Sequence, residues 1–89
     1  MIYGVFFRQL LATAVIGELA DSGYDTEHWR LDGLSRPHKI VNADPKLGAN
    51  QVRYQARFVD DATGYVYNIS VNCDPVTIAF GVIKEASGK

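Results

Sequence analysis

An alternation of apolar and polar residues in the C-terminal half constrains the fold more than any other feature. Residues 52–58 alternate with period two, and residues 65–73 do so again after the connector Asp60–Gly64. Period two is typical of half-buried strands, and a short connector between two of them predicts an antiparallel hairpin. The inward face is expected to carry the apolar set, which is Val52, Tyr54, Ala56, Phe58, Tyr65, Tyr67, Ile69, Val71 and Cys73. The polar residues between them are expected on the opposite, solvent face.

The N-terminal part carries a helical pattern over residues 5–22. Apolar residues recur there at i, i+3, i+4, i+7 and i+8, at Phe7, Leu10, Leu11, Ala14 and Val15. Further apolar residues widen this arc, so we expect the helix to be covered on more than one side; they are Phe6, Ala12, Ile16 and Leu19. Gly23 suits the left-handed position after a helix C-terminus, and it predicts the stop.

The middle of the chain, residues 24–50, is harder to interpret. Thr26–Leu31 fits either a short strand or one turn of helix, and Asp32–Gly33 is a dipeptide typical of turns. Residues 38–41 are predicted to form a short strand, and residues 42–50 are predicted to form a loop.

After a tight turn at Asp74–Pro75, residues 76–83 alternate again and are predicted to form a third strand, with Ile78 and Phe80 facing the helix. The expected fold is therefore α+β, with one N-terminal helix packed on a three- to four-stranded antiparallel meander. Residues 1–89 are expected to form a single domain, because this length supports only one core.

Composition restricts the cellular context. The one cysteine cannot form an internal disulfide, which favours a cytoplasmic protein. The apolar start of the chain lacks a basic leading region, and Arg8 and Gln9 interrupt it, so neither a signal peptide nor a membrane span is expected.

Motifs that carry chemistry are sparse. Cys73 lies on the predicted inward face, where a thiol is usually inert, although a pair with His28 or His38 stays open. No Cys or His spacing matches a metal site, and there is no glycine-rich phosphate loop, so no cofactor is expected. The adjacent acids Asp60 and Asp61 are interpreted as turn formers.

Charge is segregated although the net charge is only −1. Residues 30–57 hold six basic residues and two acidic ones, and the flanking regions are acidic. A basic region with arginines on one strand face could bind single-stranded nucleic acid, and this is the alternative function.

The favoured interpretation is a small non-catalytic protein-binding module: an inhibitor, adaptor or regulator of the kind encoded by phages or mobile elements. It would act through a sheet face or edge, because the outward row is rich in arginine and asparagine and poor in lysine. A homodimer through strand edges or this face is also expected. A small enzyme using Cys73 with a histidine is the second alternative. The predicted partner-binding residues are Arg53, Gln55, Arg57, Asn68 and Asn72, with Arg36, His38 and Lys39 at the rim.

Overall fold

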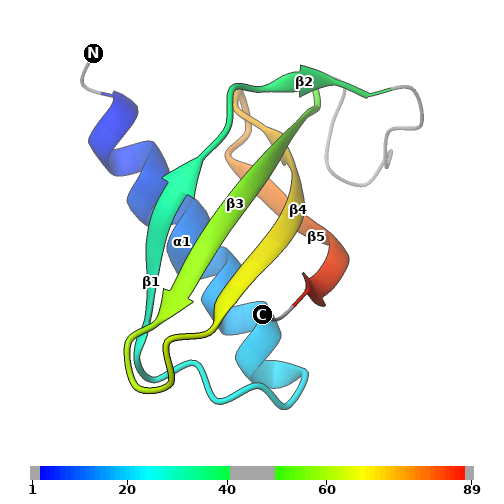
Figure 1. The fold of residues 1–89 in the computed structure, drawn as a ribbon. Helices are drawn as coiled ribbons and strands as arrows, with labels where there is room; N and C mark the ends of the chain where they lie inside the picture. The colour runs from blue at the N-terminus through cyan, green and yellow to red at the C-terminus, as the bar shows by residue number, and fades with distance from the viewer. Residues whose placement is uncertain (1–2, 41–49, 88–89) are drawn as a thin grey trace.

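The described part of the chain folds as one helix on a five-stranded antiparallel sheet (Figure 1). The computed structural model describes residues 3–40 and 50–87. The elements are α1 (Tyr3–Asp21), β1 (Trp29–Leu34), β2 (His38–Lys39), β3 (Val52–Asp60), β4 (Val66–Asp74) and β5 (Ala79–Ser87). The predicted α+β class is confirmed, and β2 raises the strand number to five.

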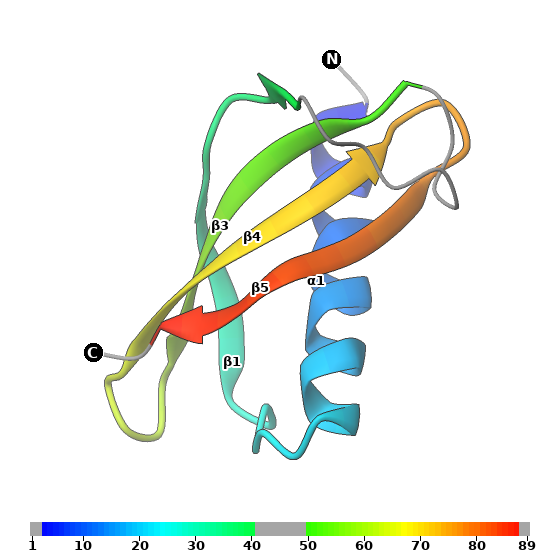
Figure 2. The same ribbon diagram turned by 90° about the vertical axis from the view of Figure 1, so that its right-hand side faces the viewer.

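The strands follow one another across the sheet in the order β1-β3-β4-β5, as expected of a meander. The short strand β2 pairs with β3 beyond the end of β1, so β1 and β2 together border one side of β3. Helix α1 covers one face of the twisted sheet (Figure 2). The opposite face of the sheet is toward the viewer in Figure 1. In the described ranges, no helix has the length and apolar character needed to cross a membrane.

The predicted hairpin of β3 and β4 and its inward face are confirmed, except at Tyr65. Tyr54 pairs with Val71, Ala56 with Ile69, and Phe58 with Tyr67. The inward side chains Ala56, Phe58, Ile69, Val71 and Cys73 are all buried, whereas Tyr65 lies just before β4 and is exposed. The inward face therefore forms the core under the helix.

The connector is a tight turn built by Asp60. The Asp60 Oδ1 atom accepts a hydrogen bond of 2.8 Å from the Ala62 N–H, and its backbone carbonyl accepts one of 2.7 Å from the Gly64 N–H. Gly64 has a φ of 81°, a conformation that glycine adopts without a steric penalty. The interpretation of Asp60 as a turn former is confirmed.

Helix α1 buries Leu11, Val15 and Leu19 against the sheet. Its C-terminus is closed by Gly23, which has a φ of 103°. The Gly23 N–H donates to the Ala20 carbonyl and the Tyr24 N–H donates to the Leu19 carbonyl, each at 3.0 Å. These two bonds form a Schellman motif, so the predicted stop signal is confirmed.

The expectation that α1 is covered on more than one side is wrong for the described part of the chain. Phe6 is 64% exposed and Leu10 is 47% exposed. The periodic pattern assigned Leu10 to the buried stripe, but the stripe that meets the sheet is Leu11, Val15 and Leu19. The apolar arc of α1 is wider than the area that one face of the sheet can cover, so part of the arc stays exposed to solvent.

The predicted strand start at residue 76 is also wrong. Residues 75–78 form a turn, β5 begins at Ala79, and Ile78 is 44% exposed instead of facing the core. The cause is Asp74, whose Oδ1 accepts the backbone N–H groups of Val76 at 2.9 Å and Thr77 at 3.3 Å. This side chain satisfies the backbone of the turn and so competes with strand pairing.

The dipeptide Asp32–Gly33, expected as a turn, lies inside β1. The pairing register with β3 shifts between Leu31 and Gly33, so this site is a β-bulge. Thr26–Leu31 resolves into a turn followed by the start of β1. Residues 38–39 do form a strand, but Ile40, predicted to belong to it, lies outside β2. The predictions for residue 41 and for most of 42–50 fall outside the described residues.

Candidate functional site

The face of the sheet opposite α1 carries the predicted partner-binding residues of β3 and β4. Arg53 lies directly opposite Asn72, and Arg57 lies directly opposite Asn68. Residues directly opposite in an antiparallel pair point to the same side. We call the outward polar side chains of β1, β3 and β4 the polar face; it consists of Arg30, Asp32, Arg53, Gln55, Arg57, Asn68, Ser70 and Asn72.

Ion pairs fix the arginines at one end of the polar face. The Arg57 Nε atom lies 3.2 Å from Asp32 Oδ2, and Arg30 Nη1 lies 3.0 Å from Asp32 Oδ1. Arg30 Nε also lies 3.0 Å from Asp61 Oδ2, and the hydrogen bonds that Arg30 donates to Asp32 and Asp61 raise the pKa of Arg30. The bulge supplies Asp32 to both arginines. Asp32 is 35% exposed and the other three side chains are about half exposed, so the pairs orient them and contribute little to stability.

Hydrogen bonds to uncharged amide oxygens fix the side chains at the other end. The Ser70 hydroxyl donates to Gln55 Oε1 at 2.9 Å, and Arg53 Nε donates to Asn72 Oδ1 at 2.9 Å. Asn72, which the sequence placed among the exposed partner-binding residues, is only 1% exposed. It therefore positions Arg53 and is not itself available to a partner.

A shallow depression of about 320 Å³ lies between β1, β3 and β4. Ser35, Gln55, Arg57 and Asn68 contribute polar groups to its lining. Ser35 continues the ladder beyond β1, since its N–H donates to the Gln55 carbonyl at 2.9 Å and its hydroxyl accepts the Gln55 N–H at 2.8 Å. This depression offers hydrogen-bond donors and acceptors on a rigid backbone.

The three predicted rim residues are exposed, but they do not share one face. His38 lies opposite Arg53 and belongs with the polar face, whereas Lys39 lies opposite Val52 and points to the helix side. Arg36 is exposed in the connection between β1 and β2. The structure thus joins His38 to the predicted site and separates Lys39 from it.

The structure does not bring Cys73 and a histidine together. Cys73 is fully buried opposite Val52, on the face away from His38, and His28 lies at the far end of the sheet, where its carbonyl accepts the Asp61 N–H. Burial raises the pKa of the Cys73 thiol to about 11, and the nearby Asp74 carboxylate contributes to this rise. At neutral pH the thiol is therefore protonated and a poor nucleophile. Among the described residues, no group of three His, Cys, Asp or Glu side chains could hold a metal ion.

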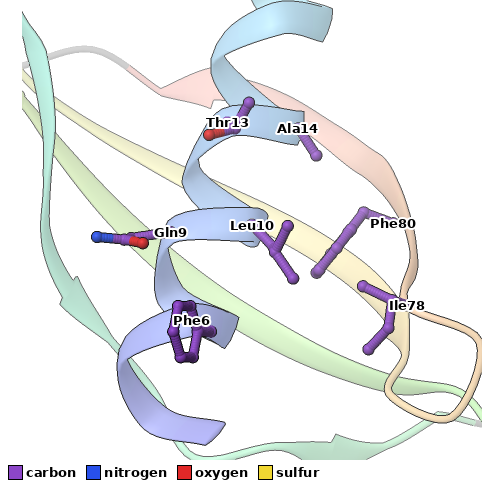
Figure 3. A pocket seen from close by; sticks show the side chains of 7 residues that line it. All are labelled: Phe6, Gln9, Leu10, Thr13, Ala14, Ile78 and Phe80. Carbon is purple, nitrogen blue, oxygen red and sulfur yellow. The ribbon is translucent and has the colours of Figure 1, made fainter.

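A second surface, on the helix side, was not predicted from the sequence. A groove of about 650 Å³ runs between α1 and the turn that precedes β5 (Figure 3). We call it the helix groove; it is lined by Phe6, Gln9, Leu10, Thr13, Ala14, Ile78 and Phe80. Figure 3 shows Leu10 and Ala14 on the side of α1 that faces Ile78 and Phe80. The sequence feature that indicates the helix groove is the wide apolar arc of α1.

Ile78 stands at the edge of the helix groove in a strained conformation. Its φ is 56°, in the left-handed region that β-branched residues rarely adopt. Such residues cost on the order of 1–3 kcal/mol and persist only where the surrounding structure fixes them. Here the hydrogen bonds that the Val76 and Thr77 N–H groups donate to the Asp74 carboxylate fix the turn.

Comparison of the chain with protein-family models, with curated protein sequences and with solved structures gives no match.

Proposed function

We propose that the protein is a small non-catalytic protein-binding module that uses the polar face. The observation that supports this most directly is the fixed arrangement of its arginine and amide side chains. Asp32, Ser70 and Asn72 each hold a neighbouring long side chain in place. Because binding must otherwise order such side chains at a cost in entropy, a face already ordered by its own contacts favours association.

The charge balance of the polar face favours a protein over nucleic acid. Arg30 and Arg57, two of the basic residues that suggested a nucleic-acid site, are paired with Asp32 and Asp61. Phosphate binding depends on arginine and lysine charges that can displace counterions. A guanidinium already neutralised by a carboxylate contributes less to that attraction, but it keeps free N–H groups for amide and carboxylate acceptors of a protein.

The test is capture of partners from extracts of the cells that encode the protein, compared between the wild type and the double variant Arg57→Ala, Asn68→Ala. Both side chains are exposed and face each other across β3 and β4. We expect the specific partner to be lost, with a melting temperature within a few degrees of wild type, because exposed residues contribute little to stability. Arg53 is left unchanged, since removing it would leave the buried Asn72 without its hydrogen bond.

Arg8→Ala is the control, because Arg8 is exposed on α1 and outside the polar face. Capture of the same partner by the double variant at wild-type yield would refute the proposal. Loss of the partner on nuclease treatment, or loss that follows a steep salt dependence, would instead identify the nucleic-acid alternative.

A further inference from the structure

One exposed side of α1, which borders the helix groove, is apolar and uncharged along most of its length. Phe6, Leu10, Thr13 and Gly17 follow one another at spacings of four, three and four residues, and all are exposed. We call them the exposed stripe. Alternating spacings of three and four align residues on one side of a helix and are typical of the seam between two packed helices. A helix that is apolar on all sides is normally buried on all sides.

The exposed stripe is graded in size along the helix. Its N-terminal half carries the two large side chains, Phe6 and Leu10, and its C-terminal half carries Thr13 and Gly17. A second copy in parallel would set large residues against large and small against small, so the helices could touch at one end only. An antiparallel copy sets each large residue against a small one, and it also opposes the two helix dipoles favourably.

Gly17 has no role in the packing of its own chain. A Cβ atom added there would meet nothing within 4 Å, although glycine weakens a helix interior relative to alanine. A close approach by another molecule is a physical reason for a glycine at such a position.

We propose that the exposed stripe is a homodimer interface in which two α1 helices pack antiparallel, with Phe6 of each copy against Gly17 of the other and Leu10 against Thr13. One two-fold axis makes all four contacts at once, as an isologous interface requires. This interface lies on the side of the sheet opposite the polar face and is independent of the proposed function.

The exposed area is sufficient for a weak dimer. Phe6 is 64% exposed, Leu10 is 47% exposed and Ile78, across the helix groove, is 44% exposed. Together they offer on the order of 300 Å² of apolar surface per copy. With the flanking residues, two copies would bury about 1,000 Å², the lower limit for a specific interface, so we expect the dimer to be weak.

A membrane surface fits the exposed stripe less well than a second copy. Helices that lie on membranes carry many lysines or arginines beside their apolar side. The charged residues of α1 are Arg8, Glu18 and Asp21, so the helix is acidic overall.

Sedimentation equilibrium from low to high micromolar concentrations of the protein tests for the dimer. We expect the wild type to dimerise and Leu10→Glu to weaken the dimer at least tenfold, with unchanged circular dichroism. The control Arg8→Gln makes the same change in charge at an exposed residue that lies with Ala12 and Val15, away from the stripe. A wild type that stays monomeric throughout would overturn the proposal. A dimer that survives Leu10→Glu would assign the interface to the strand edges or the polar face.

The variant Gly17→Ala should have opposite effects on the stability of the helix and on the stability of the proposed dimer. Alanine should raise the melting temperature of the dilute monomer, because nothing obstructs its Cβ atom. It should weaken the dimer at least tenfold, because Phe6 of the other copy would meet the added methyl group. An unchanged or tighter dimer would refute the close approach at Gly17.

Disulfide trapping tests the antiparallel register. A mixture of Leu10→Cys and Thr13→Cys proteins should form the mixed disulfide dimer in preference to either variant alone, while the buried Cys73 stays unreactive. Preferential formation of the Leu10→Cys homodimer would show that the helices are parallel and would overturn the proposed packing.

Discussion

Replacement of Phe58 by alanine should lower the free energy of unfolding more than replacement of Phe80 by alanine. Phe58 is 0% exposed and its ring lies 5.9 Å from the ring of Trp29. An aromatic side chain buries on the order of 150–250 Å², which corresponds to roughly 4–6 kcal/mol at about 25 cal/mol per Å². Alanine keeps only its Cβ atom in that space, so the expected loss is about 3–5 kcal/mol.

Phe80 provides an internal comparison. The sequence alone predicts equal effects at the two positions, but in the structure Phe80 is only partly buried and lines the helix groove. Its truncation should therefore cost about 1–2 kcal/mol, within the ordinary range for single substitutions. The difference between the two variants tests the observed core more directly than either value alone.

Urea unfolding followed by tryptophan fluorescence measures both effects. The chain has one tryptophan, and Trp29 contacts Phe58, so its emission reports on this part of the core. A domain of this size has a total stability of about 5–10 kcal/mol, so Phe58→Ala should lower the midpoint by about half or more. A loss below about 2 kcal/mol at Phe58, or a larger loss at Phe80, would refute the assignment of the core.

Three further predictions concern single residues. Burial raises the pKa of the Asp74 carboxyl group, but hydrogen bonds from the backbone N–H groups of Asn50, Val76 and Thr77 lower it. The hydrogen bonds outweigh burial, so the pKa of Asp74 lies below its ordinary value of 3.8. A carboxylate whose pKa is lower in the folded state stabilises the fold at pH values above 3.8, and this contribution is lost as the pH falls further. The melting temperature of Asp74→Asn should therefore lie below that of the wild type at pH 7, and the difference between the two should shrink as the pH falls below 3.8. A difference that stays constant with pH would contradict this. Cys73 should react slowly with a thiol reagent in the native protein and fast in denaturant, and equal rates would show that the thiol is exposed. Gly23→Ala should destabilise by about 1–2 kcal/mol because of the positive φ, whereas Gly17→Ala should stabilise the dilute monomer, and a melting curve of each variant checks the opposite signs.

The elements that the sequence predicts well are those specified by local patterns. The alternation in residues 52–58 and 65–73 determines which side chains of β3 and β4 face the helix. The turn at Asp60–Gly64 then sets the pairing register, so the outward pairs Arg53–Asn72 and Arg57–Asn68 follow from residue order alone.

The failures arise where a side chain or a distant strand decides the structure. Alternation at residues 76–82 indicates a strand, but the Asp74 carboxylate forms a turn with the same backbone. Helical periodicity shows that the apolar arc of α1 is wide, but it does not show which part the sheet covers, and this is why Leu10 was misplaced.

In the candidate site, too, local patterns predict some features, whereas contacts with distant residues determine others. Register predicts that Asn72 points outward, but its burial depends on how its neighbours fill the surface around it. Strand alternation places His38 and Lys39 on opposite faces, but which of them joins the polar face depends on the pairing of β2 with β3, and no local pattern between residues 24 and 50 specifies that pairing. The pairing of Arg57 with Asp32 depends on a bulge, which shifts the register by one residue.

The two surfaces lie on opposite sides of the molecule, and this has a consequence for how they combine. A dimer formed through α1 would leave each polar face pointing outward, since the sheet lies between that face and the helix (Figure 2). Neither copy would obstruct the partner site of the other, so dimerisation and partner binding can occur together. Two such sites on one particle increase the effective affinity for any partner that carries repeated epitopes. A weak dimer is then sufficient, because occupied polar faces bring the helices of neighbouring copies together at high local concentration.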